Sequence, residues 1–219
     1  MAHPVTNTAA YIEIANRYAL RADDFLLDVA RDRAAELTKR LGFYQLRAAV
    51  GIADRSADLR VVAGWDGAPD FPVGSVVAPD PPLASLGVRA IVPADAGMPD
   101  GTGRTTPDAY RAHRIRLGVP EGGADFAFGD AFPHDADMDQ LGGVDFGKGC
   151  YTGQEVVARM EHRAAARKRI VPVVARQPLP PAGTEIMGGG AVVGTLGSSS
   201  GRRGLALVRL DRIEEIAAK

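Results

Sequence analysis

The sequence has 219 residues but only one cysteine and one tryptophan, and it has no excess of either charge. A single cysteine excludes an internal disulfide, and it excludes the set of four thiolates that usually holds an iron–sulfur cluster within one chain. Any cluster would need further ligands or a partner. Twenty-six basic and 27 acidic residues give a net charge of −1, so the overall charge does not favour binding to nucleic acid or to an anionic membrane.

Long apolar runs are also missing, since no stretch approaches the roughly 18 residues that a membrane-spanning helix needs. The first residues, M-A-H-P, lack the basic and then apolar pattern of a signal peptide. With 46% hydrophobic and 24% charged residues, the composition is typical of a globular protein with one substantial core or two smaller ones. We therefore expect a cytoplasmic protein with no membrane partner.

The most informative stretch is residues 148–155, which read K-G-C-Y-T-G-Q-E. Thr152 and Glu155 have the spacing of a capping box, in which each side chain accepts a hydrogen bond from the other residue's backbone amide. Thr152 is then the N-cap of a helix. Tyr151, just before the cap, and Val156, at the fourth helical position, are spaced to pack as a hydrophobic staple.

Cys150 lies just outside this predicted helix start, two residues after Lys148. The positive end of a helix and a nearby ammonium both favour the thiolate, so we expect Cys150 to be more acidic than an average cysteine. Free cysteine is also among the most often buried residue types. The residues alone therefore leave open whether Cys150 is reactive or a small buried side chain.

This stretch resembles the signature of the YgfZ-type folate-binding proteins, which are relatives of the glycine-cleavage aminomethyltransferase. The similarity extends upstream through Phe132-Pro133 and residues 141–146, and downstream through residues 156–159. Weaker similarity covers residues 25–28, 44–48, 110–120 and 204–211, and so most of the chain.

The resemblance implies an α+β protein with a GcvT-like folate-binding fold of mixed or antiparallel sheets, followed by a small C-terminal antiparallel β-barrel. It also implies a tetrahydrofolate-type cofactor and a role in iron–sulfur cluster assembly or repair, with iron–sulfur proteins or assembly factors as partners. Cys150 and Lys148 would then be the catalytic pair. The implied folate-binding residues are Tyr151, Gly153, Gln154, Glu155, Arg159 and Arg114.

Two other functions stay open. A folate-dependent aminomethyl or one-carbon transferase would need a positioned acid or base, which the sequence does not reveal, so enzyme activity is undecided. A tRNA-linked accessory role would use the basic strip Arg159–Arg169, where a phosphate backbone or a folate glutamyl tail could bind. A solvated helix end explains the same strip.

We place a domain boundary near Ala166, which gives a folate-binding region at residues 1–165 and a barrel at residues 166–219. Compared with the family, both ends look short, and the N-terminal segment that carries part of the pocket is not found. In the barrel region, short strands are expected at residues 170–175, 192–196 and 205–210, separated by glycine-rich turns.

In the first region the patterns predict a helix over residues 31–41 and another over residues 107–117. The second has Thr106 as its N-cap, and Gly118 follows its end. Strands are expected at residues 19–29, 44–53, 59–65, 75–78 and 88–92. Residues 117–147 contain no lysine or arginine but seven acidic residues, which indicates an irregular, solvated acidic loop.

Two stretches match a phosphate-binding or a metal-binding motif only in part. Residues 142–148 match the phosphate-loop spacing up to the lysine, but Gly149 stands where a Ser or Thr must hold magnesium. The alternating aspartates after His134 imitate a calcium loop, but from Asp135 the sixth position is Gln140 and the twelfth is Phe146. No metal site is therefore predicted.

Overall fold

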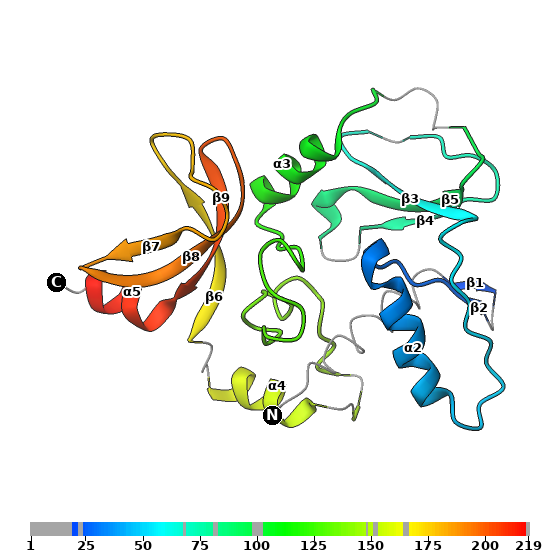
Figure 1. Cartoon of the computed structure of the whole chain (residues 1–219), viewed down its shortest axis with the longest axis horizontal. Helices are drawn as coiled ribbons and strands as arrows, with labels where there is room; N and C mark the ends of the chain where they lie inside the picture. Colours follow the sequence, from blue (N-terminus) through cyan, green and yellow to red (C-terminus); the bar gives the residue numbers. More distant parts are fainter. Residues whose placement is uncertain are drawn as a thin grey trace. The chain divides into compact units, whose positions relative to one another are not determined.

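The computed structural model is α+β, with antiparallel sheets and separate helices (Figure 1). The structure describes residues 19–21, 24–67, 69–80, 83–97, 103–147, 149–150, 153–163 and 167–217. Contacts divide the chain into two units, one with residues of Ile14–Asp80 and Gly87–Gly103, the other with residues of Pro81–Leu86 and Arg104–Lys219. The predicted boundary near Ala166 lies outside the described residues and stays a prediction.

The unit of residues 14–80 and 87–103 is built on a three-stranded antiparallel sheet in the order β3-β5-β4. Its strands are β3 (Leu59–Gly64), β4 (Val76–Pro79) and β5 (Val88–Pro93). Buried Ala78 and Ile91 form its small core together with the partly buried Leu26, Leu59 and Val76. The strands predicted at 59–65, 75–78 and 88–92 are confirmed.

The same unit begins with a short hairpin of β1 (Ala19–Arg21) and β2 (Asp24–Phe25). A 3₁₀ turn, η1 (Arg31–Arg33), leads into helix α2 (Ala34–Gln45), which confirms the helix predicted at 31–41. The long strand expected over residues 19–29 is wrong, since the described residues of this range form two short strands and residues 26–29 form none.

The strand expected over residues 44–53 is also wrong. Tyr44 and Gln45 continue helix α2, which ends at Leu46 with a φ of +44°. Among the described residues no strand pairs with residues 46–53, and a strand needs a neighbour to satisfy its backbone groups. The Gln45 side chain instead donates a hydrogen bond to the Val50 carbonyl at 2.5 Å, which stabilises a turn.

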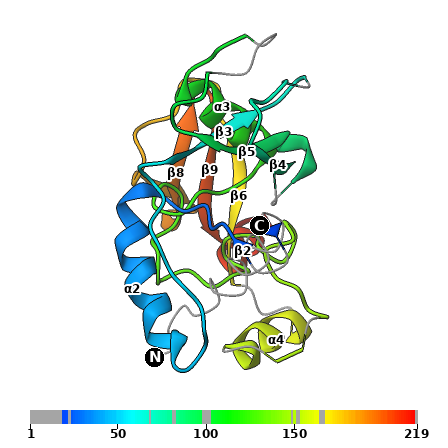
Figure 2. The same ribbon diagram turned by 90° about the vertical axis from the view of Figure 1, so that its right-hand side faces the viewer.

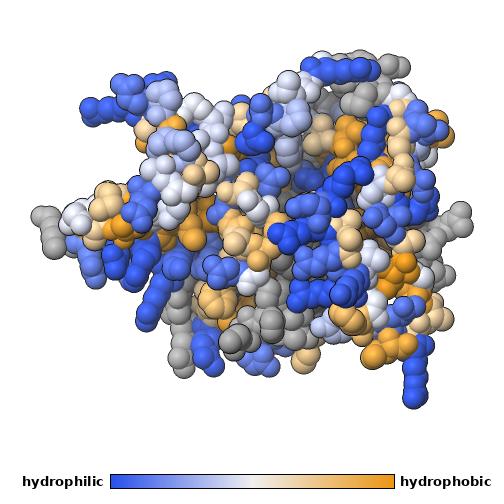
Figure 3. All heavy atoms as spheres, viewed as in Figure 1, coloured by the Kyte–Doolittle hydropathy of each residue, from blue (hydrophilic) through white to orange (hydrophobic). Residues whose placement is uncertain are grey.

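Helix α2 buries none of its residues. Phe43, Tyr44 and Leu46 at its C-terminal end are 65% to 88% exposed, and hydrophobic side chains gather on the surface there (Figure 3). In the described residues, α2 therefore gains little stability from burial.

The other unit contains a four-stranded antiparallel sheet in the order β6-β9-β8-β7, whose inner strands lie side by side in Figure 2. The strands are β6 (Lys168–Val174), β7 (Glu185–Gly188), β8 (Ala191–Ser200) and β9 (Arg203–Arg209), and helix α5 (Leu210–Ala217) follows. Leu196, Ala206 and Val208 form one buried cluster of this sheet. The three predicted strands are confirmed, whereas β7 and α5 were not predicted.

Helix α3 (Pro107–Leu117) has the predicted bounds. The Thr106 hydroxyl accepts a hydrogen bond from the Ala109 amide at 3.2 Å, and Gly118 ends the helix with a φ of +76°. This left-handed conformation is natural for glycine. The turn η2 (Ala84–Leu86), which lies between β4 and β5 in the sequence, contributes the buried side chain of Leu86 to the same unit as α3.

The segment of residues 119–147 has neither helix nor strand among its residues, as expected, but it is not a solvated acidic loop. Asp125, Asp135 and Asp137 are at most 8% exposed. Ile115 of α3, Ala136 of the segment, and Ile170 and Leu205 of the sheet form one buried cluster. The segment is therefore part of the core of this unit, and its carboxylates need buried partners.

Arg114 of α3 is one such partner. Its guanidinium lies 2.6 Å from an Asp125 oxygen, donates to the Ser198 hydroxyl at 2.9 Å and donates to the Val119 carbonyl at 2.6 Å. Asp125 also accepts from the Ser198 backbone amide at 2.7 Å. These bonds join α3, the irregular segment and strand β8 through residues that are almost fully buried.

Gly197 makes this approach possible. A Cβ atom at this position would lie 2.5 Å from an Asp125 carboxylate oxygen and 3.1 Å from the Asp125 Cα. Any side chain would push the segment away from β8.

Replacing Asp125 by Ala should lower the free energy of unfolding by about 3–5 kcal/mol, because it leaves the Arg114 charge buried without its closest partner. The matched control is Asp108→Ala, which removes an exposed ion pair with Arg111 on the same helix and should cost about 0–1 kcal/mol. Urea unfolding measures both. Equal, small losses would show that the buried pair does not hold the segment.

Among the described residues, no helix has both the length and the apolar character needed to cross a bilayer.

Candidate functional site

Cys150 is exposed, which excludes the interpretation of a small buried side chain. The glycines on either side of it, Gly149 and Gly153, have φ values of +71° and +90°. Side chains rarely adopt this left-handed conformation, so both glycines are needed for this path of the chain. The signature therefore presents its thiol on a loop shaped by glycines.

Lys148, Tyr151 and Thr152 lie outside the described residues. The lysine next to the thiol, the capping box and the hydrophobic staple therefore stay predictions. Helix α4 (Gln154–Arg163) begins two residues after the expected cap. Its Val157 is fully buried and fixes the helix within its unit.

The other residues implied by the resemblance fall into two groups. Gly153, Gln154, Glu155 and Arg159 lie in or directly before α4, so the structure keeps them in one local group with Cys150. Glu155 and Arg159 are exposed, whereas Gly153 and Gln154 are half-buried.

Arg114 lies apart from this group, and the N–H groups of its guanidinium are already bound to other residues of the protein. Besides Asp125, Ser198 and Val119, its guanidinium lies 3.2 Å from Glu121, and the residue is 3% exposed. The structure gives it a role in holding the irregular segment, and its role as a folate clamp stays a prediction. Sequence reasoning did not find Asp125 and Ser198, which lie 11 and 84 residues away from it.

Arg169 of β6 binds two of the alternating aspartates that follow His134, whose spacing partly matches a calcium-binding loop. Its guanidinium makes two hydrogen bonds to Asp139, both of 3.0 Å, and one to Asp137 of 2.8 Å. Burial raises the pKa of Asp137 and of Asp135 above the ordinary value. Burial opposes ionisation of Asp139 too, but the hydrogen bonds and charge of Arg169 outweigh it and lower the pKa of Asp139.

The basic strip is therefore shorter than predicted. Arg169 is 18% exposed in its side chain and is bound to two carboxylates. Arg159, Arg167 and Lys168 remain exposed. The side chains of residues 162–166 lie outside the described part, so binding of tRNA by this strip stays a prediction.

A cavity of about 460 Å³ lies in the unit that carries α2 and β3. This volume is typical of small-molecule sites. Aliphatic side chains such as Leu26, Leu37 and Leu41 form much of its wall, and Cys150 does not line it.

Polar groups in the cavity wall include Asp28, Arg31 and Arg60. Arg31 donates to the Ser56 carbonyl at 3.4 Å, and Asp28 pairs with Arg89 at 2.6 Å. Arg60 donates from one terminal nitrogen to the Ala96 carbonyl, while its buried Nε has no acceptor among the described residues.

Comparison with known proteins links both the barrel and the longer region to one group of proteins. Residues 167–219 match the family model "CAF17, C-terminal beta-barrel domain". The iron–sulfur cluster assembly factor IBA57 of Mus musculus, named as mitochondrial, is 33% identical over 214 residues, which are 88% of this chain and 58% of that protein.

The human IBA57, also named as mitochondrial, is 32% identical over 87% of this chain and 58% of its own length. The IBA57 homolog of Mycosarcoma maydis is 36% identical over 68% of this chain and 38% of its own length. Homologues of this chain are IBA57-type assembly factors. The chain spans 38% to 58% of the length of these three relatives.

These matches correct two expectations. The YgfZ-type proteins suggested by the motif are related to the IBA57 homologues but are not identical with them. The expected cytoplasmic location is wrong, since the relatives are named as mitochondrial. The C-terminal barrel is borne out by the family model, while the GcvT-like fold of the rest stays a prediction.

Proposed function

We propose that this chain acts in iron–sulfur cluster assembly through the thiol of Cys150, together with a partner that carries the cluster. The observation that carries this proposal is the exposure of the only cysteine on a loop bounded by two left-handed glycines. The similarity to IBA57 assembly factors across most of the chain supports it. An exposed thiol can reach an iron atom or a sulfur atom on another protein, which a buried one cannot.

The count of cysteines defines what the partner must provide. Iron–sulfur clusters are generally held by four cysteine thiolates, and this chain has one. A cluster at Cys150 therefore takes its remaining ligands from the partner, so it lies at an interface between the two proteins. Cys150 is either a ligand of that cluster or a nucleophile that helps to transfer it.

Replacing Cys150 by Ala should abolish complementation in cells that lack their own assembly factor of this kind, while the folded state is kept. The exposed thiol makes no core contact, so the unfolding midpoint should be unchanged. The readout is the activity of an iron–sulfur enzyme in those cells. Thr105→Ala, at another exposed site of the same unit, is the control, and full complementation by the Cys150 variant would refute the thiol mechanism.

Cys150→His separates the two roles of the thiol, since imidazole replaces cysteine on one iron of some clusters. If Cys150 is a ligand, this variant keeps part of the activity and shifts the absorption spectrum of the cluster formed with the partner. If it is a nucleophile, the His variant is as inactive as the Ala variant.

We further propose that a tetrahydrofolate-type cofactor binds in the cavity lined by α2 and β3. The cavity volume of about 460 Å³ suits a ligand of this class. Its aliphatic side chains can cover a pterin ring, and the guanidinium of Arg60, which lines the cavity, can donate to an oxygen of the ligand. Cys150 does not line this cavity, so the cofactor and the thiol are separable by mutation.

Calorimetry with tetrahydrofolate should give saturable binding to the purified chain. Arg60→Gln should weaken it about tenfold or more, since hydrogen bonds from charged donors contribute about 1.5–3 kcal/mol. Arg40→Gln, on α2 but outside the cavity wall, is the matched control. The same affinity in all three proteins, with unchanged unfolding midpoints, would place the cofactor elsewhere, and no binding would remove folate from the proposal.

The two other functions raised by the sequence receive no added support. An aminomethyl or one-carbon transferase still lacks an identified acid or base, because the Asp28 carboxylate in the cavity wall is paired with Arg89 at 2.6 Å and Cys150 does not line the cavity. A tRNA-linked role loses Arg169 from its basic strip, since that side chain binds Asp137 and Asp139. Neither role is needed to explain the exposed thiol.

A further inference from the structure

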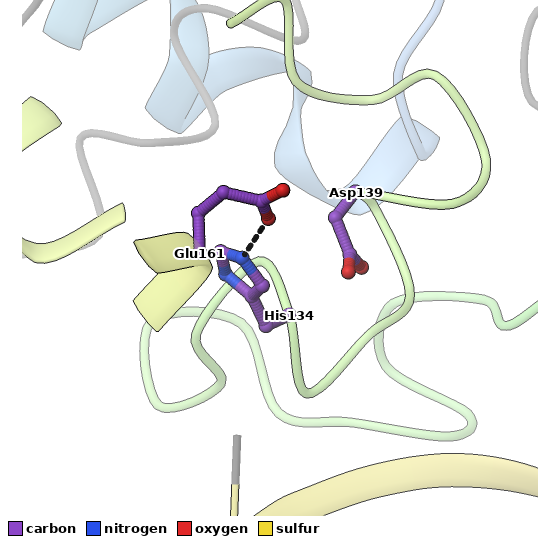
Figure 4. A group of neighbouring side chains, drawn as sticks. All are labelled: His134, Asp139 and Glu161. Atoms are coloured by element: carbon purple, nitrogen blue, oxygen red, sulfur yellow. Dashed lines mark hydrogen bonds and ion pairs between the residues drawn. The ribbon is translucent and has the colours of Figure 1, made fainter. Parts of the chain in front are cut away.

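A second group of chemically competent side chains lies in the unit of Cys150, around His134. One ligand atom from each of His134, Asp139 and Glu161 lies within 4.8 Å of the other two. Figure 4 shows the imidazole next to Glu161 of α4, with the Asp139 carboxylate beside them. The three residues come from parts of the sequence up to 27 residues apart, so the fold, not a local motif, brings them together.

His134 is buried but not satisfied. It is 2% exposed, and its Nε2 lies 3.2 Å from a Glu161 carboxylate oxygen. Its Nδ1 is buried without a hydrogen-bond partner among the described residues. When the ring donates from one nitrogen, the other presents a lone pair, and a buried lone pair without a partner is costly. The nitrogen that faces Glu161 is Nε2, so a cation held by His134 and Glu161 would bind there, and Nδ1 would then carry the ring proton.

The surrounding charges leave room for a divalent cation. Asp137 and Asp139 share the single guanidinium of Arg169, and Glu161 adds another carboxylate. Asp135 and Lys168 add one charge of each sign nearby. Three carboxylates against one arginine leave two uncompensated negative charges. Each Asp139 oxygen accepts one hydrogen bond from Arg169 at 3.0 Å and keeps a second lone pair for a metal ion.

We propose that His134, Asp139 and Glu161 form a binding site for one divalent transition-metal ion, with water in the remaining positions. One imidazole and two carboxylates are ligands that suit manganese, iron(II) or zinc. Arg169 then acts as the outer partner that orients Asp139. Glu161 is 46% exposed in its side chain, so it can adjust to metal–ligand bonds of about 2.0–2.2 Å. This site does not rest on the proposed function.

Binding would fasten helix α4 to the irregular segment. Glu161 lies on α4, the helix that follows the Cys150 loop, and His134 and Asp139 lie in the segment of residues 119–147. At present the imidazole of His134 joins the segment to α4 through one bond to the exposed Glu161 carboxylate. A metal ion would replace this bond with stronger ones and hold the C-terminal end of α4, the helix that follows the Cys150 loop, in place.

Mn²⁺ is the suitable probe, since it prefers oxygen and imidazole ligands whereas Zn²⁺ also binds thiolates such as Cys150. The tag-free chain in a Cys150→Ser background should bind one Mn²⁺ with a dissociation constant in the micromolar range by calorimetry. Glu161→Gln should weaken binding at least tenfold. Glu214→Gln, an exposed change on α5, should leave it unaltered.

A second set of measurements reports on the ligands of the ion and on stability. Electron spin echo spectroscopy of the Mn²⁺ complex should show coupling to an imidazole nitrogen, and Mn²⁺ should raise the unfolding midpoint of the Glu214→Gln protein but not of Glu161→Gln. Absence of binding at 1 mM Mn²⁺ overturns the site. Equal affinity in the Glu161 and Glu214 variants, or a bound ion without nitrogen coupling, overturns it as well.

Discussion

Two arginines, the buried Arg114 and the half-buried Arg169, hold the irregular segment from which the Cys150 loop and the His134 cluster extend. The segment of residues 119–147 has no helix or strand of its own, so regular backbone pairing does not fix its path. Arg114 binds Asp125 and thereby ties the segment to α3 and β8. Arg169 binds Asp137 and Asp139 and ties it to β6. Each pair compensates carboxylates that would otherwise be costly to bury.

The anchored segment in turn supports the functional features of its unit. At its end the chain leads to the exposed Cys150, and from its middle His134 reaches Glu161 on α4. A thiol that meets a cluster on another protein has to be exposed, yet its loop has to start from a defined place. Strands β6 and β8, to which Arg169 and Ser198 belong, provide that place. The cavity beside α2 belongs to the other unit.

Local signals predicted part of this structure well. Helix α3 has the bounds that Thr106, Pro107 and Gly118 indicate, because caps act within a few residues. Three of the four strands of the C-terminal sheet, β6, β8 and β9, also follow from their own pattern and glycine turns, whereas β7 was not predicted. The prediction failed where a residue far along the sequence determines whether a side chain is buried. Asp137 and Asp139 look like a solvated acidic loop until Arg169, 32 and 30 residues further on, provides their partner. The clustering of His134 with Glu161 has no local signal either.

The central claim is that Arg169 fixes the irregular segment and, through it, helix α4. Hydrogen exchange measured by mass spectrometry on Arg169→Gln tests it, with the exposed neighbour Arg167→Gln as the control. The account predicts faster exchange in residues 132–143 and 154–163 of the Arg169 variant, with β8 and β9 protected as in the unaltered chain. Unchanged exchange in those two regions would contradict it.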